Sequence, residues 1–261
     1  MHADFFREVH ELLQRHGTLA VVTVVRSSGS VPRRAGARMI VFPDGSLRHS
    51  IGGGRFEALV AEQALALLRE GGDPVLRAFP FRPEGPGSFG AVCGGEVEVF
   101  MEVIRRPPRL VIVGGGHCAM ALARAASLLD FRILLLEDRP DYARPERFEG
   151  CRMEAVLYAG EDFSDLPATE PDDFVVLVSR AHHTDRAALH KLLEQSPRYL
   201  GMIGSQRRVE TVFAELREKG VRAESLQRVH APIGVELGAE TPEEIAVSIL
   251  AEIVRVRRRG A

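Results

Sequence analysis

The chain has 261 residues, of which 45% are hydrophobic and 27% are charged, and its formal net charge is −2. This balance is unlike that of a nucleic-acid-binding protein, because phosphate binding needs a clustered basic surface. No apolar run approaches the roughly 20 residues that span a bilayer, and the amphipathic N-terminus is unlike a signal peptide, so we expect a soluble, cytoplasmic protein without stable membrane insertion.

The first part of the chain predicts a mixed α+β domain. Asp4 is placed to cap an N-terminal helix. Strands are predicted at 18–26 and 37–42 from their β-branched residues, with a hairpin turn at 43–46, a short strand up to Ile51, a helix from Arg55 to the Gly71-Gly72 pair and an alternating strand at 94–104. Strands and helices in this order indicate a mixed arrangement.

The segment RRPPR, Arg105–Arg109, is the predicted domain boundary. Its two prolines remove backbone donors and favour an extended chain. A chain of this length commonly forms two domains. We therefore predict a first domain at 1–104 and a second at 105–261.

The second part of the chain alternates apolar runs with helical patterns. The runs lie at 109–113, 131–137, 153–157, 174–178 and 199–203, and helices are expected at 117–129, 184–195, 205–219 and 242–257. Thr184 or Asp185 is expected to cap the second of these helices. Repeated strand–helix units are typical of a parallel sheet, so this domain is predicted to be Rossmann-like.

A glycine-rich turn, Gly114-x-Gly116-x-x-Ala119, follows the first of these strands, and Glu137 and Asp138 end the next one. Such glycines let a pyrophosphate approach a helix N-terminus, where unpaired N–H groups favour anions. The alternative is a turn that only the packing of strand and helix requires. NAD(P) or another nucleotide is therefore a candidate ligand.

A glycine triplet, Gly52-Gly53-Gly54, also precedes the helix of the first domain. Its backbone can form an anion-binding nest, with Arg55 adding positive charge. A simple turn between strand and helix fits the sequence equally well.

The three cysteines are widely spaced and form no disulfide framework. Cys93 lies in a glycine-rich stretch at the start of a strand, where a thiol can be accessible. Cys118 lies at a helix N-terminus, whose dipole would lower the pKa of the thiol. Most isolated cysteines are buried apolar residues instead, and Cys151 has no supporting context.

Histidines follow several strands of the second domain. His117 lies in the glycine-rich turn, where a small residue normally approaches the phosphates, and His182 and His183 follow the strand at 174–178. The carboxyl ends of parallel strands form the ligand edge of such a sheet. His230 is a further candidate, but the spacing does not suit a helical pair of metal ligands, so no metal site is predicted.

Several motifs follow one another along the chain. The first domain carries VVRSSGSVPRRAGARMIV, SIGGGRFEALV and CGGEVEVFMEV, and the second carries VIVGGGHCAMALARAASLLDFRILLLEDRP, YLGMIGSQRRVETVF and VHAPIGVELGAETPEEIAVSILAEI. Together they cover nearly the whole chain, and they resemble the XdhC/CoxI family of accessory proteins of molybdenum hydroxylases. The resemblance implies an α/β protein in which a mixed α+β XdhC/CoxI domain precedes a Rossmann-like domain.

The same resemblance implies a function. It predicts a protein that binds molybdenum cofactor (molybdopterin), supports its sulfuration and delivers it to the apo form of a hydroxylase such as xanthine dehydrogenase. A cysteine desulfurase is an expected further partner. We also expect a homodimer, in which the glycine turns of both domains serve one cofactor.

The predicted site residues are taken from these motifs. Cys93 would supply a soft thiolate that contacts molybdenum or sulfur, and Arg33, Arg34 and Arg55 would neutralise the phosphate of the pterin. The cofactor-binding residues are predicted to be Gly52, Gly53, Gly54, Arg55, Gly114, Gly116, His117, Glu137, Asp138, Arg180 and His182.

Two positions depart from the family pattern. The family loop usually ends in glycine, where this chain has Ala119. The added methyl group leaves less room for a ligand to approach the helix N-terminus. The family often has TRGH after the fourth strand of the second domain, where this chain has SRAHH. Arg180 and one histidine are retained there, but the glycine is replaced.

Two other functions compete with this one. An NAD(P)-dependent oxidoreductase would use the glycine-rich turn with Glu137 and Asp138, although no tyrosine has a lysine four residues on and no Walker A or His-Glu-x-x-His motif occurs. A scaffold would dock the partner enzyme without binding a ligand. The sequence favours a cofactor chaperone over a catalyst.

Overall fold

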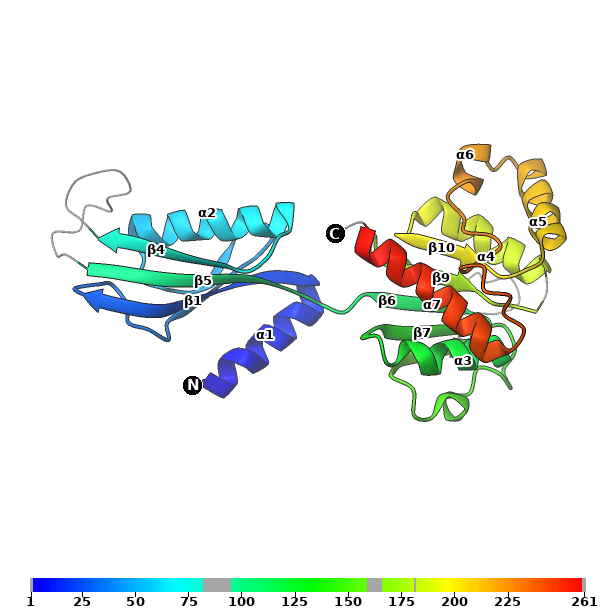
Figure 1. The fold of residues 1–261 in the computed structure, drawn as a ribbon, viewed down its shortest axis with the longest axis horizontal. Coiled ribbons are helices and arrows are strands. Elements are labelled where there is room, and N and C mark those ends of the chain that lie inside the picture. Colours follow the sequence, from blue (N-terminus) through cyan, green and yellow to red (C-terminus); the bar gives the residue numbers. More distant parts are fainter. Residues whose placement is uncertain (1, 82–94, 159–165, 181, 260–261) are drawn as a thin grey trace. The chain divides into compact units, whose positions relative to one another are not determined.

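The computed structural model describes residues 2–81, 95–158, 166–180 and 182–259, and residues 1, 82–94, 159–165, 181 and 260–261 lie outside this description. The chain divides into two compact units, Met1–Arg106 and Pro107–Ala261 (Figure 1). Each unit has its own sheet and its own hydrophobic clusters. Each therefore buries its apolar residues separately, as a domain does.

The first unit is an antiparallel sheet with helices. Its elements are α1 His2–His16, β1 Thr18–Gly29, β2 Arg38–Val41, β3 Leu47–His49, α2 Gly54–Glu70, β4 Val75–Phe81 and β5 Gly95–Arg105. The strands lie in the order β3-β2-β1-β5-β4, and all neighbours are antiparallel. The predicted mixed α+β character of this region is confirmed.

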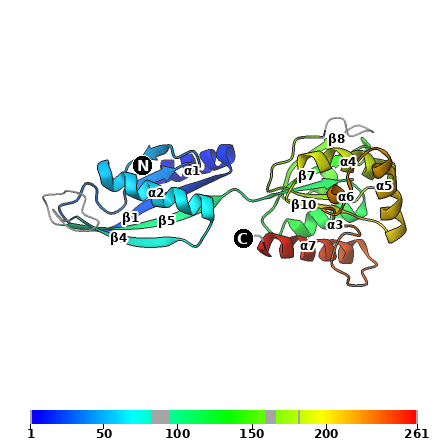
Figure 2. The same cartoon turned by 90° about the horizontal axis from the view of Figure 1, so that it is seen from above.

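The two helices of the first unit cover opposite faces of its sheet (Figures 1 and 2). Side chains alternate along a strand, and in β1 Ala20 and Val22 join the cluster under α2. Leu19 and Val21 join the cluster under α1. The almost unbroken apolar run of β1 is thus explained by burial on both sides.

Two details of the first unit differ from the sequence predictions. The helix α1 begins at His2, so Asp4 lies inside its first turn and does not cap it. The edge strand β4 is not predicted from the sequence, and among the described strands it pairs with β5 alone. Pro80 lies within it, and proline is tolerated in a sheet mainly on such edge strands.

The second unit is a parallel sheet between two helical layers. Its elements are β6 Arg109–Val113, α3 His117–Ala126, β7 Arg132–Glu137, the 3-10 helix η1 Pro145–Phe148, β8 Met153–Tyr158, β9 Phe174–Leu177, α4 His182–Gln195, β10 Tyr199–Met202, α5 Gln206–Glu218, α6 Ala223–Leu226 and α7 Pro242–Arg259. The strand order is β10-β9-β6-β7-β8, and all neighbours are parallel. This is the order of a Rossmann fold, so that prediction is confirmed.

Helices α3 and α7 cover one face of this sheet, and α4 and α5 cover the other (Figure 2). In β6, Leu110 and Ile112 point to the first layer, whereas Val111 and Val113 point to the second. Strands buried on both faces are continuously apolar. The strand order reverses between β6 and β9, and the carboxyl ends of these strands are where such sheets bind ligands.

Some boundaries in the second unit differ from the predictions. Because α4 begins at His182, Thr184 and Asp185 lie inside its first turn and do not cap it. A single parallel bridge between Gly201 and His230 extends the sheet beyond β10. Among the helices of the described ranges, none is both long and apolar enough to cross a membrane.

Candidate functional site

The first glycine triplet lies in the turn between β3 and α2. Gly52, Gly53 and Gly54 have φ angles of 141°, 77° and 65°, a region that favours glycine. An added Cβ on Gly52 would lie 2.5 Å from the Cβ of Pro32. The turn therefore lies directly against the loop between β1 and β2, which contains Arg33.

Glu57, in the first turn of α2, holds this triplet. Its Oε2 accepts hydrogen bonds from Ser50 Oγ at 2.5 Å, from the Ile51 N–H at 2.9 Å and from the Gly53 N–H at 3.2 Å. Burial opposes ionisation, but these donors outweigh burial and hold the pKa of Glu57 below its ordinary value. The backbone of the triplet therefore already binds one carboxylate, which belongs to the chain itself.

An open hollow of about 430 Å³ lies beside the triplet. It is lined by Phe5, Arg33, Gly36, Ala37, Arg38, His49 and Ser50. His49 Nε2 lies 2.7 Å from Glu8 Oε2, so this ring is already paired. Ser50 belongs both to the wall of the hollow and to the hydrogen bonds around Glu57, so the hollow borders the predicted anion site.

Three arginines around the triplet suit an anionic ligand. Arg33, Arg34 and Arg55 are exposed, and none of their guanidinium groups has a hydrogen bond or ion pair to a residue that the structure describes. A guanidinium matches the geometry of phosphate with a planar set of donors. Within the described ranges, the positive charge of these three side chains is not neutralised.

Cys93, the predicted contact for molybdenum or sulfur, lies in the segment 82–94, outside the described residues. The chain re-enters the sheet at Gly95, which pairs with Gly29 at the end of β1. An added Cβ on Gly95 would lie 2.8 Å from the carbonyl oxygen of Ser30. Gly95 therefore lies beside the start of the loop that carries Arg33.

The second glycine triplet follows β6. Gly114 has a φ of 105°, and an added Cβ would lie 2.9 Å from the Cα of Ser179 after β9. An added Cβ on Gly115 would lie 2.9 Å from Glu137 Oε2, whereas the space around Gly116, the N-cap of α3, is open. Packing therefore requires the first two glycines, and the third one adjoins open space.

Glu137, at the end of β7, is fully buried and holds this second turn. Its carboxylate accepts hydrogen bonds from the Gly115 N–H and from Arg139, whose Nε lies 2.6 Å from Oε1. Burial opposes ionisation, but these donors outweigh it and lower the pKa of Glu137 to about 2. In nucleotide-binding Rossmann domains an acid at this place contacts the ribose, whereas here the carboxylate is already bonded within the protein.

The next residue, Asp138, has the opposite electrostatic character. Its side chain is 16% exposed, and burial together with the adjacent charge of Glu137 raises the pKa of Asp138 to about 6. Thr184 Oγ1, in the first turn of α4, lies 3.5 Å from Asp138 Oδ2. A carboxyl group with a raised pKa at the ligand edge of a sheet is a candidate for contact with a ligand.

The remaining predicted residues follow β6 and β9. His117 begins α3 and is exposed, and Arg180 follows β9 and is also exposed. His182 begins α4, but its side chain is not described. Because the strands are parallel, the carboxyl ends of β6, β7 and β9 bring Gly116, His117, Asp138 and Arg180 to one edge of the sheet.

An ion pair that was not predicted from the sequence lies behind this edge. Asp185 is fully buried, accepts a hydrogen bond from Ser179 Oγ at 2.5 Å and pairs with Arg208 of α5. Arg208 also donates to the carbonyl oxygens of Ser179 at 3.2 Å and Arg180 at 3.3 Å. The pair fixes the loop after β9. Its only signal in the sequence was that Arg208 lies inside the motif YLGMIGSQRRVETVF.

His230 belongs to a structural network. Its Nδ1 lies 3.2 Å from Glu252 Oε1, and the same carboxylate accepts hydrogen bonds from Tyr199 Oη and the Gly234 N–H, both at 2.8 Å. Burial opposes ionisation of Glu252, but its donors outweigh it and hold its pKa below the ordinary value. The network ties the turn after His230 to α7.

The two described cysteines are partly buried. Burial raises the pKa of Cys118 and also that of Cys151. The predicted lowering of the Cys118 pKa is therefore wrong, because the loss of hydration outweighs the dipole of α3. In the part of the chain that the structure describes, no group of histidine, cysteine and acidic residues could hold a metal ion.

Known proteins match both units of the chain. Residues 110–253 match the XdhC Rossmann domain, and residues 12–79 match the XdhC and CoxI family. The uncharacterized protein YqeB of Escherichia coli K12 is 38% identical over 259 residues, which are 98% of this chain and 47% of that protein. A probable xanthine dehydrogenase subunit of Bacillus subtilis 168 is 29% identical over 163 residues, 62% of this chain and 47% of that protein. The chain thus spans about half the length of these two relatives.

In two further comparisons the match covers most of this chain and most of the other protein. The molybdenum cofactor insertion chaperone PaoD of Escherichia coli K12 is 26% identical over 289 residues, which are 98% of this chain and 89% of that protein. A crystal structure of a xanthine dehydrogenase from Bacillus halodurans is similar over 95% of each chain, with a TM-score of 0.53 and 20% identity. At that identity the likeness shows the fold alone. From the two domain matches, this chain belongs to the XdhC and CoxI family.

Proposed function

We propose that this protein binds molybdenum cofactor and inserts it into a molybdenum hydroxylase of the xanthine dehydrogenase type. Two relatives support this: the insertion chaperone PaoD and the probable xanthine dehydrogenase subunit of Bacillus subtilis. The cofactor is then a cargo that must be taken up and released. Its site should therefore recognise an anionic pterin phosphate without enclosing it permanently.

The observation that carries the proposal is the cationic hollow of the first unit. Its volume of about 430 Å³ lies in the range of small-molecule sites. Arg33 lines it, and Arg34 and Arg55 add charge that no described acid neutralises. Ion pairs that stay exposed to water and salt are weak enough to be exchanged, which suits a cargo.

Cys93 is proposed to contact the molybdenum or its sulfur ligand, since thiolates prefer soft metals. We further propose that the cofactor is sulfurated while it is bound, with a cysteine desulfurase as the sulfur donor. A homodimer is part of the same proposal. Gly116, His117, Asp138 and Arg180, at one edge of the sheet of the second unit, are proposed to bind a nucleotide.

An NAD(P)-dependent oxidoreductase is the second candidate function. The open space at Gly116, where α3 begins, favours it, because a helix N-terminus binds phosphate well. Glu137 weighs against it, since its carboxylate is buried and bonded to Gly115 and Arg139. It is therefore not available for a ribose hydroxyl.

The test is cofactor retention by protein that is produced together with molybdenum cofactor. Molybdenum is measured by mass spectrometry and the pterin by fluorescence after oxidation. Arg33→Gln should lower the retained amount roughly tenfold, because a charge-assisted hydrogen bond contributes about 1.5 kcal/mol or more. Arg69→Gln is the control, since Arg69 is exposed at the other end of α2 and should change nothing.

Two further measurements separate the finer proposals. Cys93→Ala should retain less cofactor and should fail to activate an apo-hydroxylase in the presence of a desulfurase, and light scattering should give the mass of a dimer. Protein that holds neither molybdenum nor pterin but turns over NAD(P) with a small substrate would instead establish the oxidoreductase.

A further inference from the structure

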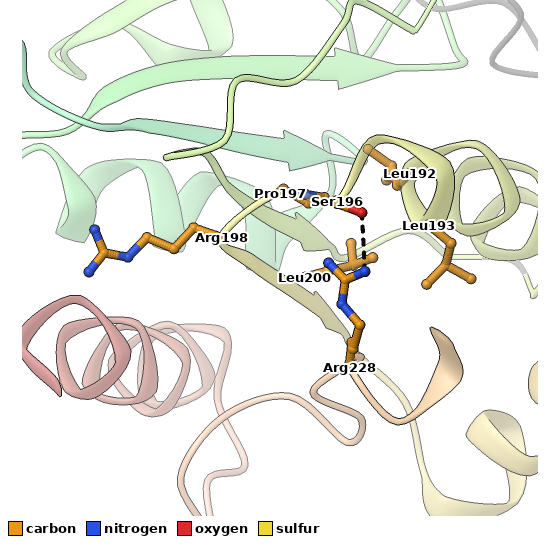
Figure 3. Close-up of a pocket in the computed structure, with 7 residues that line it drawn as sticks. All are labelled: Leu192, Leu193, Ser196, Pro197, Arg198, Leu200 and Arg228. Carbon is orange, nitrogen blue, oxygen red and sulfur yellow. Dashed lines mark hydrogen bonds between the residues drawn. The ribbon is translucent and has the colours of Figure 1, made fainter. Parts of the chain in front are cut away.

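A second hollow lies in the second unit, beside the amino end of β10. The candidate nucleotide site of this unit lies at the carboxyl ends of the strands instead. The second hollow has a volume of about 240 Å³ and lies between the end of α4, the start of β10 and the turn after α6 (Figure 3). The glycine triplet of the second unit follows the carboxyl end of β6, whereas this hollow adjoins Pro197, before the amino end of β10. It is therefore separate from the predicted cofactor site.

The floor of this hollow is apolar. Leu192 of α4 is fully buried and Leu200 of β10 is 5% exposed, and Leu193 and Pro197 complete the wall. Sites for drug-sized ligands usually have volumes of about 300 Å³ or more. A hollow below that size suits one compact apolar group, comparable to a leucine side chain.

One cation faces this hollow at its rim. Arg228 donates from Nη1 to Ser196 Oγ at 3.1 Å, and it has no acidic partner among the residues that the structure describes. Arg198 also borders the hollow, but Figure 3 shows its guanidinium directed away. It pairs with Asp172 at 3.6 Å and donates to the carbonyl oxygen of Arg257 at 3.1 Å. Among the described residues, the hollow therefore presents one guanidinium, that of Arg228, whose hydrogen bond is to the neutral hydroxyl of Ser196.

The conformation of Ser196 supports a role in binding. Ser196 has a φ of 56° and its N–H bonds to the carbonyl oxygen of Leu192 at 3.3 Å, which is the helix ending where glycine is usual. A side chain is unfavourable in this left-handed region. Its hydroxyl, however, positions Arg228, which glycine could not do. A strained residue of this kind is often retained for function.

We propose that this hollow binds a small monocarboxylate that carries one compact apolar group. The apolar group lies on Leu192, Leu193 and Leu200, and the carboxylate accepts hydrogen bonds from Arg228 and Ser196. Hydrogen bonds between a guanidinium and a carboxylate are charge-assisted and roughly twice as strong as those between neutral groups. A single cation at the rim matches a single negative charge, so phosphates and dicarboxylates fit less well.

The test is a titration of the full chain with 4-methylpentanoate, followed by the NMR signals of the leucine methyl groups. Millimolar or tighter binding is expected. The neutral amide of the same acid should bind about tenfold more weakly, because it lacks the charge that Arg228 recognises. A shift of the methyl signals by acid and amide alike would overturn the proposal, as would no shift by the acid.

Three variants locate the site. Arg228→Gln should weaken binding of the acid about tenfold, whereas Arg198→Gln, at the same hollow, should leave it unchanged. Ser196→Gly keeps the helix ending, since glycine suits a φ of 56°, and should weaken binding several-fold. Full affinity in Ser196→Gly and Arg228→Gln would contradict the assignment. Binding of a leucine-terminated peptide without binding of the free acid would replace the small ligand by a protein terminus and overturn it too.

Discussion

In each glycine triplet a backbone N–H donates a hydrogen bond to a glutamate of the same chain, but the two glutamates differ in their separation from the triplet along the sequence. Glu57 lies four residues after Gly53, in the helix that the triplet begins. Glu137 lies 22 residues after Gly115 and reaches it only because β6 and β7 pair. The first arrangement is a local helix cap, and the second is a tertiary contact between neighbouring strands.

This difference teaches how to interpret a glycine turn before a helix. Such a turn offers backbone N–H groups to an anion. In both units, one of these N–H groups already donates to a carboxylate of the same chain. The turn alone therefore does not indicate an external ligand. The stronger indication is a charge that has no partner among the described residues, as at Arg33 in the first unit, and open space, as at Gly116 in the second.

The tertiary contact of Glu137 should contribute more to the free energy of unfolding than the local contact of Glu57. Glu137→Ala is expected to lower the free energy of unfolding of the second unit by about 3–5 kcal/mol, because Arg139 and the Gly115 N–H then lose a buried charged partner. Urea unfolding followed by circular dichroism, with hydrogen exchange of residues 109–116, measures the loss. Glu154→Ala is the matched control, since its pair with Arg132 is 39% exposed on the Glu154 side. A loss below about 1 kcal/mol, the range of surface pairs, would contradict this prediction.

The local cap should matter less. Glu57→Ala is expected to destabilise the first unit by about 2 kcal/mol, because a half-buried carboxylate loses its hydrogen bonds to Ser50, Ile51 and Gly53. Hydrogen exchange at the start of α2 reports the change. Glu62→Ala, on the exposed side of the same helix, should have almost no effect. If Glu57→Ala costs as much as Glu137→Ala, the contrast between local and tertiary support fails.

The smallest predicted effect is a pH-dependent change in stability at Asp138, the residue after Glu137. The raised pKa of Asp138 means that its ionisation opposes folding. This penalty is absent below about pH 4, the ordinary value for aspartate, grows as the pH rises towards about 6 and is complete above it. Asp138→Asn should therefore stabilise the second unit by roughly 1 kcal/mol at neutral pH and by nothing in acid. A series of urea unfolding curves across this pH range tests it, and an equal gain at every pH would refute it.

The predicted strands agree closely with the structure where burial is strong. The central strands β1, β6 and β9 could be predicted from the sequence because their residues are buried on both faces, which makes a continuous apolar run. The edge strand β4 could not be predicted in this way, since three of its residues in a row are exposed and, among the described strands, it pairs with β5 alone. The four-residue helix α6 is too short for a helical period to appear.

For the candidate site, the sequence by itself determined which segments are candidates for binding a ligand. It pointed to both glycine triplets, to Arg33, and to the residues after β6, β7 and β9, because glycine, arginine and histidine at element ends have distinct chemistry. Residue type and spacing along the chain suffice for that. They also sufficed for the family, through motifs in their order.

Only the tertiary structure decided which of these groups remain available. It placed Gly52 against Pro32, which joined two motifs beside one hollow, and it showed that Glu137 is bonded within the protein. It also raised the pKa of Cys118, against the expectation from its helix position, and revealed the pair of Asp185 with Arg208. The physical reason is that hydrogen-bond partners and hydration depend on strand pairing and side-chain packing between distant residues, which spacing along the chain does not record.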